Sequence, residues 1–183
     1  MRRLLVLAAW AAFAALPPSA RAQEPTVVLL VRHAERAAEP GPDPALSPAG
    51  EARAQALAAA LADAHVGAIL TTQLRRTQLT AAPLARALGL TPVVIETGRD
   101  VAEHARAVTD TVRRRFAGRT VLVVGHSNTV SAIVAALGGP AIAAPCDTEF
   151  ANLWVLVLRS GEVSLVRSSY GAPDPPPPAD CRP

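Results

Sequence analysis

The feature that most constrains the fold is the run from Thr26 to Val31, TVVLLV, which is followed at once by Arg32 and His33. The run is too short for a helix and apolar on both faces, which is typical of a strand buried on both sides of a sheet. The end of such a strand lies at the edge where open α/β sheets bind their ligands. An arginine beside a histidine there predicts an anion site that contains a nucleophile or a base.

Three further apolar runs follow, separated by segments with helical periodicity. Strands are expected at 66–71, 92–95 and 120–124, and helices from 47 to about 64, 74–88, 100 to about 116 and 129–137. Ser47 and Pro48 suit the N-cap and first turn of a helix, and Asp100 with Glu103 forms a capping box. Alternation of this kind builds a parallel sheet between two helical layers. We therefore predict an α/β fold, a three-layer αβα sandwich.

The C-terminal part of the chain adds a hairpin and a tail to this fold. Two β-rich runs, 152–159 and 162–168, flank a Ser-Gly turn and predict a C-terminal hairpin that adds antiparallel strands to a mainly parallel sheet. The length of 183 residues suits one domain, predicted to span 23–171. Residues 172–183 are rich in proline, and we expect this tail to be disordered unless a disulfide tethers it.

Residues 1–22 have the pattern of a secretory signal peptide, with an uncleaved anchor as the weaker alternative. Arg2 and Arg3 precede an apolar run at 4–16, and Ala20-Arg21-Ala22 fits the small-x-small cleavage rule. The run is shorter than the ~20 residues that span a bilayer, so no stable membrane anchor is expected after cleavage. Cleavage removes three arginines and no acidic residue, which brings the formal charge from +3 to zero. The basic pI therefore gives no reason to expect a nucleic-acid partner, and we expect an exported protein, periplasmic or secreted.

Two cysteines, Cys146 and Cys181, remain in the mature chain. An even number of cysteines in an oxidising compartment favours a disulfide, which would pin the tail to the domain. The alternative is a pair of unpaired thiols. Neither cysteine lies in a metal-site pattern.

The ends of other predicted strands bring further basic residues to the same edge. Arg75 and Arg76 follow the second strand, and His126 follows the fourth at the start of a helix. The free N–H groups of that helix start, around Ser127 and Asn128, add a weaker phosphate cradle. This convergence of basic groups predicts a site for an oxyanion.

The residue types indicate phosphoryl chemistry. Arginine is suited to multidentate phosphate recognition, and nearby positive charge lowers a histidine pKa. A neutral imidazole can attack phosphorus to give a phosphohistidine, while arginines balance the charge of the transferring group. No metal or other cofactor is expected, because the sequence has no clustered Asp/Glu set and no close His pair.

These residues resemble those of a known family. The Arg32-His33 pair, LSPAGEARAQALA at a helix start, LRRTQLTA at 74–81 and VGHSNT at 124–129 are similar to landmarks of the histidine phosphatase superfamily, with its phosphoglycerate-mutase-like fold. The resemblance covers roughly 26–167 and implies a phosphatase that acts on a small phosphorylated substrate.

The resemblance also implies roles for individual residues. His33 would be the phosphorylated nucleophile, and Arg32, Arg76 and His126 would hold the phosphoryl group. Arg76 rather than Arg75 takes the arginine position of the family, because Thr77 supplies the small residue that usually follows.

The chain departs from the family pattern in two places. Ala34, Glu35 and Arg36 follow the histidine, where many members have a glycine and then a threonine and an asparagine. The span between Arg76 and His126 is short, as in the compact phosphohistidine-phosphatase-type members. It lacks room for the insertions with which mutases and phytases bind substrate.

Two alternatives belong to other functional classes. A serine hydrolase would use Ser127 in a nucleophile elbow, but the motif ends in Thr129 rather than glycine, and all four histidines precede the serine. The second alternative is a non-catalytic module that binds an anion or a partner with the same pocket, since a fold does not determine its function.

A phosphomonoester needs a proton donor for its leaving oxygen. We predict Glu35, because side chains two residues apart in an extended segment point the same way and Glu35 follows His33 at that spacing. Asp100, Glu103 and Glu149 are the alternatives.

Export predicts a processed and oxidised protein. Mass spectrometry of the periplasmic or secreted fraction should find a chain that begins at Gln23, because cleavage follows Ala22. The oxidised chain should be lighter than its reduced form by about two mass units, for one disulfide. A cytoplasmic protein that retains Met1 would contradict this prediction.

Overall fold

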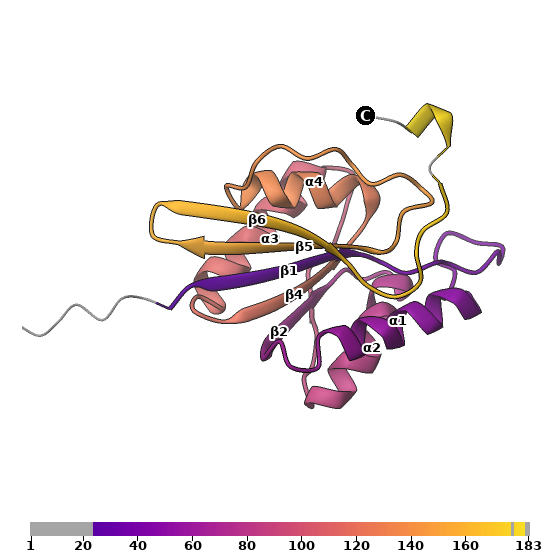
Figure 1. Cartoon of the computed structure of the whole chain (residues 1–183), viewed down its shortest axis with the longest axis horizontal. Helices are drawn as coiled ribbons and strands as arrows, with labels where there is room; N and C mark the ends of the chain where they lie inside the picture. The colour runs from indigo at the N-terminus through magenta and orange to yellow at the C-terminus, as the bar shows by residue number, and fades with distance from the viewer. Residues whose placement is uncertain (1–23, 177, 182–183) are drawn as a thin grey trace, which may run out of the picture.

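The computed structural model describes residues 24–176 and 178–181, so the predicted signal peptide lies outside the described residues (Figure 1). In chain order the elements are β1 (Thr26–Arg32), α1 (Pro48–Ala60), β2 (Val66–Thr71), α2 (Arg75–Leu88), β3 (Val93–Val94), α3 (Val101–Arg115), β4 (Thr120–Gly125), α4 (Ser127–Ala136), β5 (Asn152–Arg159), β6 (Glu162–Ser169) and the 3₁₀ turn η1 (Ala179–Cys181). None of the helices among these residues is both long and apolar enough to cross a membrane.

The sheet has six strands in the order β3-β2-β4-β1-β5-β6. The strands β1 to β4 pair in parallel, and β5 pairs antiparallel with β1 and with β6. The first strand is central, as its apolar sequence predicts. Val28 and Leu30 enter the core on one face of the sheet, and Leu29 and Val31 enter the core on the other.

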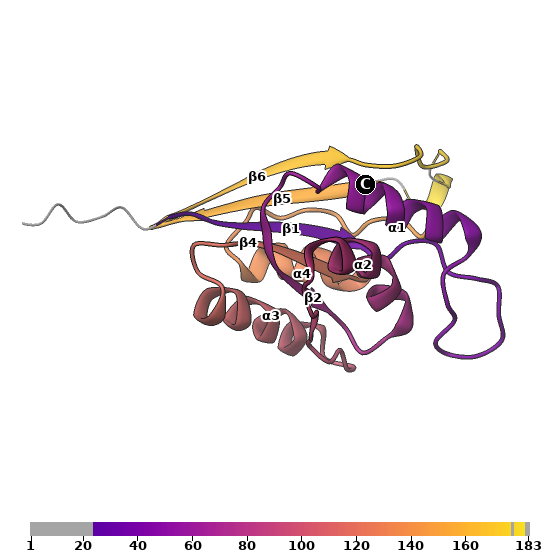
Figure 2. The ribbon, with the colours of Figure 1, turned by 90° about the horizontal axis from the view of Figure 1, so that it is seen from below.

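Helices cover both faces of the sheet (Figures 1 and 2). The pair α1 and α2 packs with the cluster that contains Leu57 and Leu84, whereas α3 and α4 pack with the cluster that contains Val108 and Ile133. The predicted three-layer αβα sandwich with a C-terminal antiparallel hairpin is confirmed.

Local signals place most helix boundaries. Ser47 accepts a hydrogen bond from the backbone N–H of Gly50, and Asp100 accepts from two N–H groups in the first turn of α3. Gly89 ends α2 with a φ of 64°. The first helix ends at Ala60, earlier than predicted, and α4 begins at Ser127 rather than at 129.

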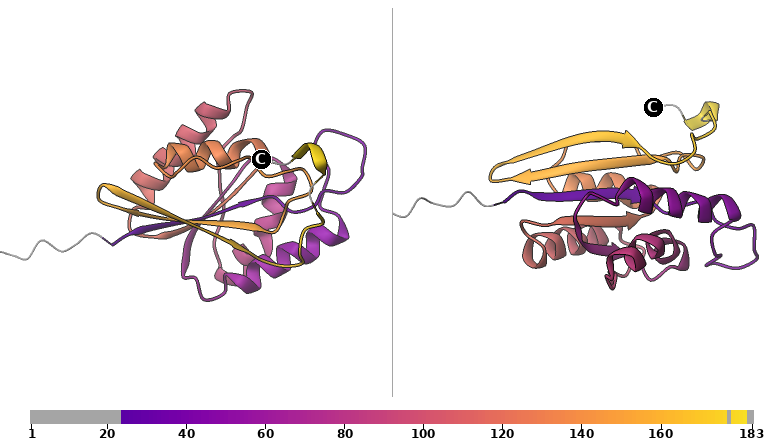
Figure 3. Two further views of the ribbon diagram at one scale, coloured as in Figure 1. Left: turned by 45° about the horizontal axis from the view of Figure 1, so that its top comes forward. Right: turned by 60° about the horizontal axis from the view of Figure 1, so that its bottom comes forward.

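The tail beyond Ala172 is not free, which corrects the expectation of disorder. The Asp174 carboxylate accepts hydrogen bonds from the backbone N–H groups of Phe150 and Ala151, and a disulfide joins Cys146 to Cys181. The tail thus returns to the end of the sheet at which β1 finishes (Figure 3). Its proline-rich composition suggested disorder, but an acidic side chain and a covalent bond outweigh that local tendency.

Candidate active site

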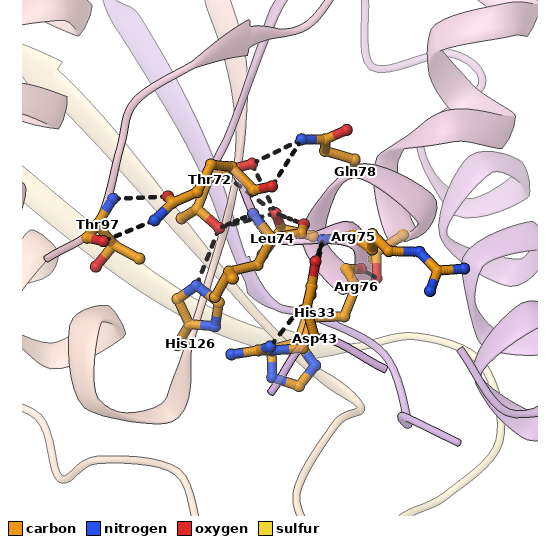
Figure 4. Close-up of polar contacts among 12 residues, drawn as sticks. His33, Asp43, Thr72, Leu74, Arg75, Arg76, Gln78, Thr97 and His126 are labelled. Carbon is orange, nitrogen blue, oxygen red and sulfur yellow. Dashed lines mark hydrogen bonds and ion pairs between the residues drawn. The ribbon is translucent and has the colours of Figure 1, made fainter. Parts of the chain in front are cut away.

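Two histidines face each other where β1 and β4 end (Figure 4). His33 directly follows β1, and its backbone N–H donates to the carbonyl of Gly125 at 2.9 Å. His126 follows β4, so this hydrogen bond brings the two residues together. Their ring centroids lie 5.3 Å apart with the rings at 61°, and both residues are buried.

The tautomer of His33 follows from one contact. Its Nδ1 lies 2.8 Å from the carbonyl oxygen of Ala34. A carbonyl can only accept, so Nδ1 carries the proton and Nε2 keeps its lone pair. The Ala34 N–H donates to the Thr80 hydroxyl at 2.9 Å, which holds the backbone of Ala34 in place. His33 therefore presents a bare Nε2, the form that a nucleophilic imidazole needs.

The guanidinium of Arg32 is held by a turn between α4 and β5. Its Nη1 donates to the carbonyls of Cys146 at 2.6 Å and Glu149 at 3.1 Å, and its central carbon lies 4.2 Å from the ring centroid of Phe150. Asp147 lies 3.5 Å from Nη2, but its side chain is 93% exposed and this ion pair is weak. The buried Nε has no hydrogen-bond partner within the described part of the chain.

Arg76 lies in the first turn of α2. Its Nη1 is 3.7 Å from Asp43, whose carboxylate also accepts from the backbone N–H of Arg75 and so fixes the helix start. The Nε and Nη1 atoms of Arg76 are buried without a hydrogen-bond partner among the residues described. Arg75 is exposed, and its side chain points away from the histidines in Figure 4. Arg76 is therefore the arginine that belongs to this site.

A chain of hydroxyl groups determines the tautomer of His126. The Thr77 hydroxyl donates to the carbonyl of Leu74 at 2.8 Å, so its oxygen is free to accept. The Thr72 hydroxyl lies 3.0 Å from that oxygen and 3.1 Å from His126 Nε2. The Thr72–Thr77 contact needs the only hydroxyl proton of Thr72, since Thr77 has already used its own. The placement in which Nε2 of His126 donates to Thr72 satisfies all three of these contacts at once, and it leaves Nδ1 bare.

The start of α4 contributes less to the site than the histidines and arginines do. The hydroxyl of Thr129 accepts from the backbone N–H of His126 at 2.9 Å and closes the first turn. Ser127 is half-buried and Asn128 is exposed in that turn. Their N–H groups stand at the positive end of the helix, where an anion would be favoured.

Burial and positive charge keep both imidazoles neutral. Burial, with contributions from Arg32 and Arg76, lowers the pKa of His33 to about 4. Burial, followed by the neighbouring His33, lowers the pKa of His126 to about 3. A group with a lowered pKa is protonated only below that pH, so both bare nitrogens are available at neutral pH. Burial likewise lowers the pKa of both guanidiniums, which is the direction an anion would reverse.

Glu35, predicted as the proton donor, is engaged elsewhere. Its two carboxylate oxygens accept from Nε of Arg53 at 2.8 and 3.0 Å, and Nη2 of Arg53 lies 2.8 Å from Oε1. Arg53 projects from α1 and is only 5% exposed, so its charge needs a close partner. This demand overrides the i, i+2 alternation behind the prediction. The geometry therefore gives Glu35 a structural role.

The other proposed proton donors are also accounted for. Glu149 accepts from the backbone N–H of Cys146 at 2.8 Å, and Asp100 caps α3. Glu103 is exposed in the first turn of that helix. None of these contacts points to proton transfer.

Three contributors were missed from the sequence. Asp43 lies in a Pro- and Gly-rich loop that only predicts irregular structure, and Phe150 precedes β5 with no distinguishing pattern. The position of Thr72, in the same segment after the second strand as Arg76, could have indicated its role. Hydroxyl side chains are common in such segments, however, so the position alone does not single it out. Among the described residues no group of three or more His, Cys, Asp or Glu side chains gathers as a metal would require.

The arrangement suits a tetrahedral oxyanion. Buried N–H groups of two guanidiniums lack hydrogen-bond partners, and two imidazoles offer bare nitrogens, one of which likewise lacks a partner among the residues described. Unpartnered buried polar groups are rare and indicate a ligand or a catalytic role. An anion with several oxygens would satisfy the donors while His33 Nε2 faces its central atom.

Comparison with known structures gives the same fold. The putative phosphohistidine phosphatase SixA from Agrobacterium tumefaciens is 24% identical, with a TM-score of 0.56 over 80% of this chain and 98% of that chain. The protein histidine phosphatase SixA in complex with tungstate is 21% identical, with a TM-score of 0.61 over 78% and 96%. A mycobacterial glucosyl-3-phosphoglycerate phosphatase is 18% identical, with a TM-score of 0.60 over 84% and 100%.

Sequence comparison identifies the family. No curated protein matches the chain. The family described as the histidine phosphatase superfamily (branch 1), however, matches at residues 28–98 and 90–169. These ranges contain His33, both site arginines and His126. The chain therefore belongs to the histidine phosphatase superfamily.

Proposed function

We propose that the protein is a metal-independent phosphatase that hydrolyses a phosphomonoester or a phosphoramidate through a phosphohistidine on His33. The observation that carries this proposal is the bare Nε2 of His33 beside unpartnered guanidinium N–H groups. Membership of a phosphatase superfamily supports the reaction class. The exported location predicted from residues 1–22 remains part of the proposal.

In the first step His33 Nε2 donates its lone pair to phosphorus, and the bond from phosphorus to the leaving group breaks. The Nδ1–H of His33 stays on the Ala34 carbonyl, which stabilises the positive charge that develops on the ring. Arg32 and Arg76 balance the negative charge on the phosphoryl oxygens. The leaving group departs with the bonding electron pair and takes up a proton from solvent water.

In the second step water attacks phosphorus and the P–N bond breaks, which returns the electron pair to His33 Nε2. The water must lose a proton, and the bare Nδ1 of His126 can accept it. The neighbouring phosphoryl charge favours the imidazolium that results. The two histidines therefore take different roles because their tautomers differ.

The need to protonate the leaving group limits the class of substrate. Three carboxylates proposed as acids hold structural contacts, and the fourth, Glu103, is exposed in the first turn of α3. We infer that groups which leave readily, such as a phenolate, are transferred much faster than alkoxides. The structural neighbours described as putative phosphohistidine phosphatases support a phosphoramidate as one candidate.

One assay separates this proposal from its alternatives. A phosphatase hydrolyses p-nitrophenyl phosphate, a serine hydrolase that uses Ser127 hydrolyses p-nitrophenyl acetate, and a binding module hydrolyses neither. An alkyl phosphate measured alongside tests the dependence on the leaving group. Equal rates for alkyl and aryl esters would show that an efficient acid is present after all.

The substitution His33→Ala should abolish turnover of p-nitrophenyl phosphate, because the nucleophile is lost. Acid-labile labelling of the protein by ³²P-labelled substrate should disappear with it, while circular dichroism shows a folded chain. Near-normal turnover in this variant would overturn the mechanism.

Arg76→Ala should lower kcat/KM by about 10²- to 10³-fold, the usual loss when one donor to a developing oxyanion is removed. Arg75→Ala is the matched control, since its side chain is exposed one residue away. It should lower kcat/KM by less than about twofold, as expected of a surface position. Similar losses in both variants would contradict the assignment of Arg76.

Thr72→Val should lower kcat by about tenfold to a hundredfold, because His126 loses the acceptor that fixes its tautomer. The second step should suffer most, so phosphohistidine should accumulate in the steady state. Thr72→Ser keeps the hydroxyl and should restore turnover. If the steady-state level of phosphohistidine in Thr72→Val equals that of the wild type, the role proposed for His126 as the base is wrong.

A further inference from the structure

The segment that holds Arg32 has little support of its own. The connection between α4 and β5, residues 137–151, contains no regular secondary structure. Within it the turn from Cys146 to Phe150, here called the clamp turn, supplies the two carbonyls and the aromatic ring that fix Arg32. Two local hydrogen bonds between Cys146 and Glu149 close the turn. Arg167 of β6 lies 3.7 Å from Glu149, and the C-terminal segment adds further contacts.

The C-terminal strap, residues 171–176 and 178–181, holds one end of the clamp turn through Asp174. This carboxylate accepts from the backbone N–H of Phe150 at 2.9 Å and from that of Ala151 at 2.9 and 3.0 Å. Asp174 is 15% exposed and also lies 3.5 Å from Arg53, which donates to the Ala172 carbonyl at 3.0 Å. The strap is therefore fixed to α1 and to the clamp turn together.

The other end of the clamp turn is held covalently. Cys146, whose carbonyl accepts from Arg32, is bonded through its sulfur to Cys181 in the strap. A short covalent path through Cys146 thus joins the strap to the carbonyl that accepts from the Arg32 guanidinium. Asp174 and Cys181 anchor the last and first residues of the turn, so the turn cannot shift without breaking one of them.

We propose that the C-terminal strap is a positioning element of the phosphoryl site, and that Asp174 and the Cys146–Cys181 bond set the place of Arg32. Arg32 can face an anion through its unpartnered Nε only while both carbonyls hold Nη1. Release of the strap lets the turn relax and takes the guanidinium with it. The effect on turnover rests on the proposed function. The effect on anion affinity does not, because it requires only that the site binds an anion.

The experiment uses the mature chain with its disulfide formed, and compares it with Cys181→Ser and Asp174→Asn. Inorganic tungstate is the probe, measured by calorimetry, and kcat/KM is measured with p-nitrophenyl phosphate. Each variant should weaken tungstate binding by about tenfold or more, since a displacement of about 1 Å in a site can cost 10²-fold. KM should rise more than kcat falls, because Arg32 contacts the bound anion before and during transfer.

The matched control is Asp110→Asn, which makes the same chemical change at an exposed ion pair on α3. It should leave tungstate binding unchanged. Reduction of the wild-type chain should reproduce the effect of Cys181→Ser, and reoxidation should restore it. All measurements are made below the melting temperature of each variant, found by circular dichroism.

A double-mutant cycle distinguishes positioning from stability. If the strap acts through Arg32, Cys181→Ser should cost less than about twofold in tungstate affinity once Arg32→Ala is present, because effects that share one group are not additive. Full additivity, or folded variants that bind tungstate as tightly as the wild type, would overturn the proposal. If Cys181→Ser does not fold, reversible reduction and Asp174→Asn decide by the same criteria. A wild-type chain that binds tungstate without hydrolysing esters would contradict only the proposed function.

Discussion

Two guanidinium groups buried at the carboxyl edge of one sheet impose most of the requirements that the surrounding structure meets. Arg32 and Arg76 are largely removed from water, and burial lowers the pKa of both. A buried cation is unfavourable by several kcal/mol unless its surroundings compensate. The partners of Arg32 are mainly two carbonyl dipoles and an aromatic face, which hold the group without neutralising it. Its charge stays available for a ligand.

Arg53 shows what the same residue type does when its role is structural. It is as buried as Arg32, but its guanidinium forms a bidentate pair with Glu35 and also approaches Asp174. These carboxylates compensate its charge fully. Among the residues that the structure describes, the only ionic partner of Arg32, in contrast, is the exposed Asp147. The kind of partner, rather than the depth of burial, separates the arginine that we propose binds an anion from the one that joins two segments.

The sequence predicted the features that depend on local pattern and strand order. The apolar run of β1, the caps of α1 and α3 and the strand–helix alternation were enough for the layers, and the strand ends placed Arg32, His33, Arg76 and His126 at one edge. Features that depend on contacts between residues distant in sequence could not be predicted from local pattern. The pairing of Glu35 with Arg53 could not be predicted, because nothing local indicates that Arg53, distant in sequence, buries its charge beside it. Asp43 and Phe150 come from irregular segments, where spacing carries no spatial information.

The two histidines illustrate how a few neutral contacts can divide a reaction into roles. One carbonyl on Nδ1 of His33 and one hydroxyl chain on Nε2 of His126 place their protons on opposite ring nitrogens. Since positive surroundings keep both rings neutral, each offers one lone pair at a defined place. In the proposed mechanism the same residue type thus supplies both a nucleophile and a base, and neither ring has a carboxylate partner within the described part of the chain. The proposed mechanism still requires a proton for the leaving group, and this is why we propose that it favours substrates whose leaving group departs readily.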